Sequence, residues 1–166
     1  MTALRGLRPV ACLAILVLAF ATQLALDPLL GGGPDAVDVP LLVLLWFASI
    51  DRWPRVLAVG GAIALARVLV GASSAVSVAL PLGIAVLWVR AARHTIDPRE
   101  LGRRAALVLV ALSLANLAHR LRWSTPWAGT LDDGATGLVL GILSALMLFA
   151  ILDQARPLLR SADYPM

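Results

Sequence analysis

Charged residues are scarce in this sequence. They make up 14% of its 166 positions, whereas a soluble domain carries roughly 25%. Hydrophobic residues account for 60% of the chain, which is too large a share for a surface in contact with water. This balance excludes an ordinary soluble domain and favours an integral membrane protein. The length fits one domain, 1–166, because the connections between apolar runs are too short to hold a second core.

Residue types and motifs that carry chemistry are also rare. Cys12 is the single cysteine and lies inside an apolar run, so a disulfide within the chain is excluded and a metal site would lack sulfur partners. The sequence contains no HExxH, no CxxC, no glycine-rich phosphate loop and no pair of acids within its apolar runs. We therefore predict a noncatalytic protein with no catalytic residue, no cofactor and no metal.

Apolar runs dominate what is present, and they predict an all-α polytopic protein with about six short transmembrane helices. Several runs are shorter than the roughly 20 residues that cross a bilayer core, so we expect residues at their ends, or local thinning of the bilayer, to make up the length. In the second run Asp38 is expected to cap the helix and Pro40 to lie in its first turn. The six predicted spans are Val10–Leu26, Val39–Ile50, Val56–Gly71, Ser74–Val89, Ala105–Leu121 and Ala135–Leu152.

The 14 basic residues are all arginine, and their placement predicts the orientation of the chain. If the six runs cross in alternation, eleven arginines fall on one side, two on the other, and Arg67 within a span. Such a bias in short loops marks the cytoplasmic side. We therefore predict a multi-pass membrane protein with both termini in the cytoplasm and membrane lipid as its surroundings. We attribute the net charge of +4 to the arginines that set the membrane orientation, and not to a surface that binds nucleic acid.

Polar side chains inside the predicted spans are the first candidate functional residues. Arg67 lies four residues before Gly71, so it can extend to the interface or form a buried contact, for example with Asn116 or a partner's acid. Ser113, Asn116 and His119 recur at helical spacing on one face. That face is expected to contact protein, either as hydrogen bonding between helices or as a solute or proton site.

Small residues at helical spacing are the second set of candidates. Gly137, Gly141 and Ala145 occupy every fourth position of the last span, and Gly60 and Gly61 lie side by side in the third. Small residues allow two membrane helices to approach closely. We expect these positions to serve helix packing or contact with a partner.

One enzymatic alternative rests on Gly71-Ala72-Ser73-Ser74 and Ala118-His119. These residues look similar to the nucleophile motif and the Ala-His dipeptide of rhomboid intramembrane proteases, which act through a serine and a histidine. The second glycine of the rhomboid motif is Ser74 here, and no His/Asn pair precedes the serine. A turn-and-cap role is the simpler interpretation of Ser73 and Ser74.

Taken in order, several motifs resemble the rod shape-determining MreD family. They are Ala21-Thr22-Gln23-Leu24, Pro34-Asp35 followed by Pro40-Leu41-Leu42-Val43-Leu44-Leu45, Gly60-Gly61 with Arg67-Val68-Leu69-Val70-Gly71, Pro81-Leu82-Gly83, and Ile142 to Phe149 before a basic tail. Arg67 departs from the family, which favours an acid there, and Pro81-Leu82-Gly83 comes later than the family places it.

The resemblance implies a noncatalytic inner-membrane scaffold subunit of the cell-shape and peptidoglycan elongation machinery, with an MreC-like protein as its partner. It also implies a fold similar to the substrate-binding subunits of energy-coupling-factor transporters. A solute-binding subunit of a vitamin-type transporter is the alternative function. The sequence leaves open the partner surface, the oligomeric state and whether a small ligand is bound.

Overall fold

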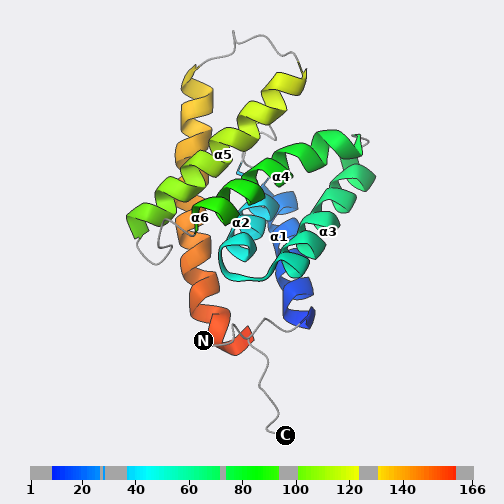
Figure 1. Ribbon diagram of the computed structural model, residues 1–166, viewed down its shortest axis with the longest axis vertical. Helices are drawn as coiled ribbons and strands as arrows, with labels where there is room; N and C mark the ends of the chain where they lie inside the picture. The colour runs from blue at the N-terminus through cyan, green and yellow to red at the C-terminus, as the bar shows by residue number, and fades with distance from the viewer. Residues whose placement is uncertain are drawn as a thin grey trace, which may run out of the picture.

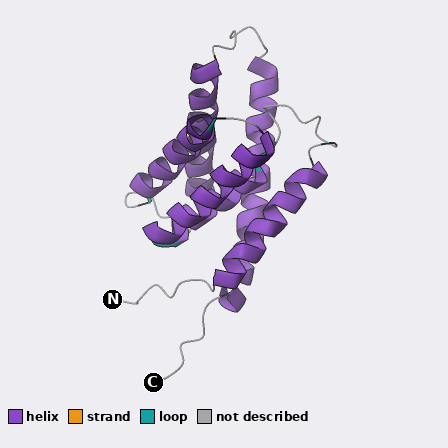
Figure 2. Cartoon of the chain, turned by 90° about the vertical axis from the view of Figure 1, so that its right-hand side faces the viewer, coloured by secondary structure: helices purple, strands orange, loops and turns teal. Residues whose placement is uncertain are grey.

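The computed structural model describes residues 9–26, 28, 37–71, 74–93, 101–123 and 131–159. Regular structure within these ranges is α-helical throughout (Figures 1 and 2), which confirms the predicted all-α class. The helices are α1 (Pro9–Leu26), α2 (Val39–Ile50), α3 (Trp53–Gly71), α4 (Ala75–Ala92), α5 (Leu101–Trp123) and α6 (Leu131–Leu159).

The helix boundaries agree best where the sequence carries a capping signal. The predicted and observed bounds of α2 are identical, and the Asp38 side chain accepts a hydrogen bond from the Leu41 N–H at 3.0 Å. Pro40 lies in the first turn as expected. By contrast, α5 and α6 extend beyond the predicted spans at both ends. The apolar run marks the part of a helix that suits lipid, and a helix continues into polar flanks where water satisfies its backbone.

Successive helices run in alternate directions in Figure 1, and the start of α1 and the end of α6 lie at the same end of the molecule. We call the end that holds the last turn of α2 and the first turn of α3 the arginine end. It carries Arg52, Arg55, Arg90 and Arg104.

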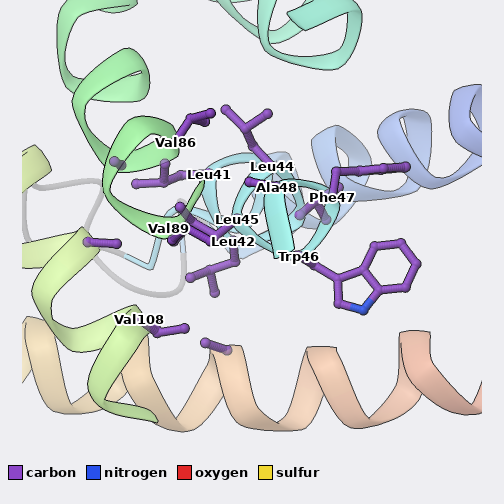
Figure 3. Close-up of a cluster of buried hydrophobic side chains, with 14 of the residues drawn as sticks. Leu41, Leu42, Leu44, Leu45, Trp46, Phe47, Ala48, Val86, Val89 and Val108 are labelled. Atoms are coloured by element: carbon purple, nitrogen blue, oxygen red, sulfur yellow. The ribbon is translucent and has the colours of Figure 1, made fainter. Parts of the chain in front are cut away.

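The core is built around α2, which packs against α1, α3, α4 and α6. Ten of its twelve residues are buried, and Leu44, Trp46 and Phe47 are completely inaccessible. Val86 and Val89 of α4 and Val108 of α5 belong to the same buried cluster as these α2 residues (Figure 3). At 1.5 Å per residue, α2 is about 18 Å long, shorter than a bilayer core of roughly 30 Å. Neighbouring helices, rather than lipid, therefore surround most of it.

The outer surface is apolar. Within the described part of the chain, four helices contain 18-residue windows long and apolar enough to cross a membrane: Pro9–Leu26, Trp53–Val70, Ala75–Ala92 and Leu138–Ala155. Large apolar side chains on them point outward, among them Leu13, Leu69 and Met147, each more than 60% exposed. An exposed apolar surface of this kind suits lipid and not water. The protein is therefore a helical membrane protein, in which α2 is a shorter apolar helix inside the bundle.

Candidate functional site

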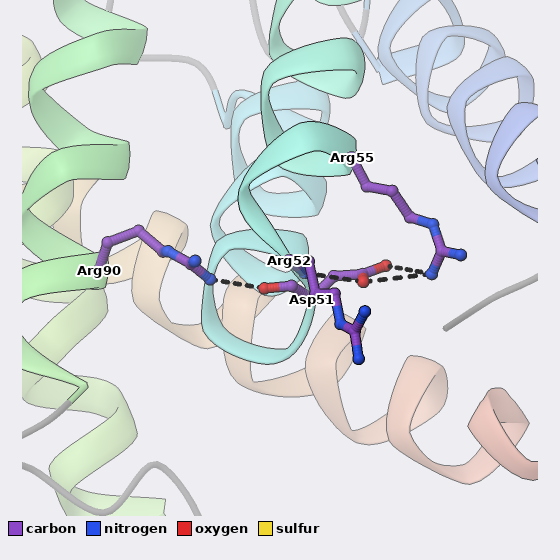
Figure 4. Close-up of polar contacts among 4 residues, drawn as sticks. All are labelled: Asp51, Arg52, Arg55 and Arg90. Atoms are coloured by element: carbon purple, nitrogen blue, oxygen red, sulfur yellow. Dashed lines mark hydrogen bonds and ion pairs between the residues drawn. The ribbon is translucent and has the colours of Figure 1, made fainter. Parts of the chain in front are cut away.

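Arg90 joins the end of α4 to the end of α2. Its guanidinium donates to the carbonyl oxygens of Asp51, at 2.5 Å, and Ala48, at 3.4 Å, and lies 4.8 Å from the centre of the Trp53 ring. The last carbonyls of a helix have no partner within it and carry the negative end of the helix dipole. Arg90 is buried, so this contact both satisfies those carbonyls and gives the guanidinium its partners (Figure 4).

Asp51 lies between Arg90 and Arg55 in Figure 4, with its carboxylate directed to the Arg55 side. The carboxylate accepts hydrogen bonds from the backbone N–H of Arg52 at 2.8 Å and from the Arg55 guanidinium at 3.3 and 3.4 Å. Asp51 is 7% exposed, and a buried carboxylate is tolerated only when it is paired in this way. The turn between α2 and α3 is thereby fixed by polar contacts on both sides.

A second polar contact at the arginine end joins α2, α5 and α6 through Asp153. One carboxylate oxygen accepts from the Trp46 indole N–H at 2.9 Å, and the other accepts from Arg104 at 2.7 Å. The Arg104 guanidinium also lies 5.5 Å from the centre of the Phe149 ring. Since Trp46 is fully buried, Asp153 supplies the partner that a buried indole N–H needs.

At the opposite end, Arg67 of α3 forms an ion pair with Asp38, the residue that caps α2. The two side chains are 30% and 31% exposed. The Gln23 side chain of α1 accepts from the Val39 N–H at 2.9 Å, so α1, α2 and α3 are all joined there. The sequence left open whether Arg67 extends to the interface or contacts Asn116 or a partner's acid, and Asp38 was not among the partners considered. Pairing with a carboxylate lowers the cost of an arginine near a membrane.

The predicted polar stripe on α5 is divided. Ser113 is half-buried, whereas Asn116 is exposed and lies on the outer surface of the bundle. The side chain of His119 lies outside the described residues, as does Ser73. The Ser–His pair of the rhomboid alternative therefore falls outside the described part of the chain.

The small-residue positions serve different purposes. Gly141 and Ala145 are buried, and a methyl group built on Gly141 would lie 3.0 Å from a terminal methyl of Leu112. Gly141 therefore packs α6 against α5, and Ala145 is part of the buried core of the same chain. A methyl group built on Gly60 would lie 3.5 Å from a terminal methyl of Leu44, whereas one built on Gly61 would meet nothing within 4 Å. The surroundings of Gly137 lie outside the described side chains.

Two apolar hollows flank α3, one on each side. The first, about 290 Å³ in volume, lies between α1 and α3 and is lined by Pro9, Cys12, Leu13, Leu16, Arg55, Ala58 and Val59. The second, about 260 Å³, is a groove between α3 and α4 with α2 at its floor. Its lining consists of Leu44, Val56, Leu57, Gly60, Gly61, Ala64, Ala79, Leu82, Gly83 and Val86. We call them the α1–α3 cavity and the α3–α4 groove.

Sequence reasoning treated Arg90 and Arg104 only as markers of orientation and overlooked Asp51 and Asp153. A signal was present: each of these acids directly follows a long apolar run, on the side where arginines are in excess. An acid at that position is well placed to pair with an arginine from a neighbouring helix end. Among the described residues no three His, Cys, Asp or Glu side chains gather as metal ligands would. The predicted lack of a metal stays a prediction.

Comparison with known proteins gives no match: no protein-family model fits the chain, and neither a curated protein nor a solved structure is significantly similar to it. The resemblance to the MreD family therefore rests on the sequence motifs.

Proposed function

We propose that this chain is a noncatalytic scaffold subunit of the bacterial inner membrane, similar to MreD, that binds a transmembrane helix of a partner in the elongation machinery for peptidoglycan. The observation that carries the proposal is the α3–α4 groove. Its walls are apolar and include Gly61 and Gly83, where an added methyl group would meet nothing within 4 Å. The fold itself does not need glycine at either position.

Glycine on both walls of a groove matters in a membrane. Helices there gain no hydrophobic driving force from leaving lipid, so they associate through close packing, which small residues permit. Ala64 and Ala79 continue the small lining on the two walls. An incoming helix can therefore approach the backbones of α3 and α4 closely, with Leu44 of the rigid central helix beneath it.

The polar residues that hold the bundle together support a scaffolding role. Arg90, Arg104, Asp51 and Asp153 all have partners within the chain, and they fix the helix ends around α2. A bundle held in this way presents the groove as a preformed surface. The described residues that line the α3–α4 groove are all apolar, whereas a vitamin-binding pocket needs polar groups that converge on the solute. This contrast favours the scaffold over the solute-binding alternative.

The orientation belongs to the same proposal: both termini in the cytoplasm, with the arginine end on that side. Reporter fusions after Trp53, His94 and Ser161 are expected to give a cytoplasmic signal. Fusions after Gly32, Ser73 and Gly129 are expected to report the outside. An outside signal at His94 would contradict six crossings.

The partner is tested by co-purification from native membranes. The parent chain is expected to recover an MreC-like protein, and Gly61→Leu to lower that recovery by about tenfold, which is roughly 1.4 kcal/mol of binding free energy. Ala150→Leu is the matched control, because Ala150 is exposed on α6, outside the groove. Both variants should insert equally. Unchanged recovery with Gly61→Leu would count against the groove, and recovery of an ATPase pair in place of the MreC-like protein would favour a transporter.

A further inference from the structure

We propose that the α1–α3 cavity binds an anionic phospholipid, with one acyl chain in the cavity and the phosphate at Arg55. This site is separate from the α3–α4 groove and does not depend on the function proposed above. The cavity combines an apolar lining with one arginine, which is the pattern that an anionic lipid matches. Arg55 is the only charged residue among the seven described residues that line it.

The position of the cavity exposes it to lipid. It lies between α1 and α3, two of the four helices able to cross a membrane, and these are the two whose apolar windows are least buried, at 11% and 17%. Leu13 of the lining is 63% exposed. A volume of about 290 Å³ is at the small end of ligand sites and accommodates part of an acyl chain, while the rest of the lipid stays in the bilayer.

Arg55 lies at the level expected of a headgroup. It is the third residue of α3, two positions after Trp53. The Trp53 side chain is 41% exposed and stacks with Arg90. Tryptophan at a helix end marks the membrane interface. An arginine at that depth can donate two parallel hydrogen bonds to a phosphate, and the positive end of the α3 dipole adds to the attraction.

The contacts of Arg55 leave it able to bind a phosphate. Its side chain is 40% exposed, and its contact with Asp51 is long, at 3.3 Å. The Asp51 side chain is only 6% exposed, so the carboxylate that pairs with Arg55 lies in the interior, while Arg55 itself also lines the cavity. Figure 4 shows Arg55 reaching to the side of Asp51 opposite Arg90.

The binding test uses nanodiscs of equal parts palmitoyl-oleoyl phosphatidylglycerol and palmitoyl-oleoyl phosphatidylcholine, with native mass spectrometry of the lipids that stay on the released protein. The parent is expected to retain phosphatidylglycerol preferentially. Arg55→Gln should reduce that preference about fivefold, the effect of one arginine near a membrane surface. Arg52→Gln removes the same charge three residues away, at an exposed residue outside the cavity lining, and should leave the preference unchanged.

A cavity-filling variant separates the acyl site from the charge. Ala58 is exposed and lines the cavity, so Ala58→Trp should remove the retained lipid of either headgroup, while Ala150→Trp on α6 should not. The single cysteine gives a local readout, because Cys12 lines the same cavity. N-ethylmaleimide should alkylate Cys12 more slowly in nanodiscs containing phosphatidylglycerol than in pure phosphatidylcholine, and Arg55→Gln should abolish the difference.

Any one of three results would overturn the site. The first is an equal loss of phosphatidylglycerol preference in Arg52→Gln and Arg55→Gln, which would indicate an effect of general surface charge. The others are lipid retention that Ala58→Trp leaves unchanged, and alkylation of Cys12 at the same rate in both lipid compositions. Thermal unfolding of each variant in detergent identifies any loss caused by misfolding. Arg55→Lys, which keeps the charge but cannot donate two parallel hydrogen bonds, should then retain part of the preference.

Discussion

Helices α2 and α3 are neighbours in the chain and are both apolar, yet their surroundings are opposite. Ten of the twelve residues of α2 are buried, whereas only 17% of the apolar window of α3 is buried, and a hollow lies on each side of it. The same kind of sequence thus forms the core in one helix and an exposed surface in the next. Hydropathy measures compatibility with an apolar environment and does not distinguish protein from lipid.

The largest effect is expected from truncating a core residue of α2. Phe47 is fully buried, so Phe47→Ala should lower the free energy of unfolding by about 3–5 kcal/mol through lost packing and a new cavity. Leu57→Ala on α3, where Leu57 is 63% exposed, should change it by less than about 0.5 kcal/mol. Equilibrium unfolding in mixed detergent micelles measures both. Equal effects would mean that α2 is not the centre of the bundle.

The next effect concerns the contact that holds α2 to α5 and α6. Asp153→Asn removes the charge that pairs with Arg104, whose side chain is 16% exposed, and should cost about 2 kcal/mol. The double variant with Arg104→Gln should cost less than the sum of the two single changes, since the two groups interact directly. Additive losses would show that Asp153 acts through Trp46 alone.

A smaller effect is expected at the opposite end of α2. Arg67→Leu breaks the ion pair with Asp38, and because both groups are about a third exposed, the loss should be about 1 kcal/mol or less. Arg67→Lys should recover part of it. Full tolerance of Arg67→Leu would mean that the arginine merely extends to the interface, as one of the two sequence hypotheses held.

The smallest effect compares two glycines. Alanine is favoured over glycine in a helix by up to about 1 kcal/mol, and an added methyl group at Gly61 meets nothing, so Gly61→Ala should leave the free energy of unfolding unchanged or raise it slightly. Gly141→Ala brings a methyl group to 3.0 Å from Leu112 and should gain less or lose. The measurement is the unfolding curve of each variant. Equal shifts for Gly61→Ala and Gly141→Ala would contradict the distinction between the exposed Gly61 and the buried Gly141.

The fold class and the order of the helices could be predicted because they depend on local signals. Long apolar runs, the Asp38 cap and Pro40 determine where helices form, and α2 matches its predicted bounds. The burial of α2 could not be predicted, because it depends on which helices pack around it. The partner of Arg67 was missed for the same reason: the pair with Asp38 joins residues 29 positions apart. Gly141 and Gly61 look alike in sequence and differ only in what the fold places beside them.

The partner-facing role of α3 is tested most directly by photo-crosslinking in native membranes, with benzoylphenylalanine placed at Gly61 and, as a control, at Val139. Val139 is 55% exposed on α6, away from the α3–α4 groove. The scaffold account predicts a protein adduct with an MreC-like partner from Gly61 and none from Val139. No protein adduct at Gly61, or the same adduct in equal yield from both positions, would contradict it.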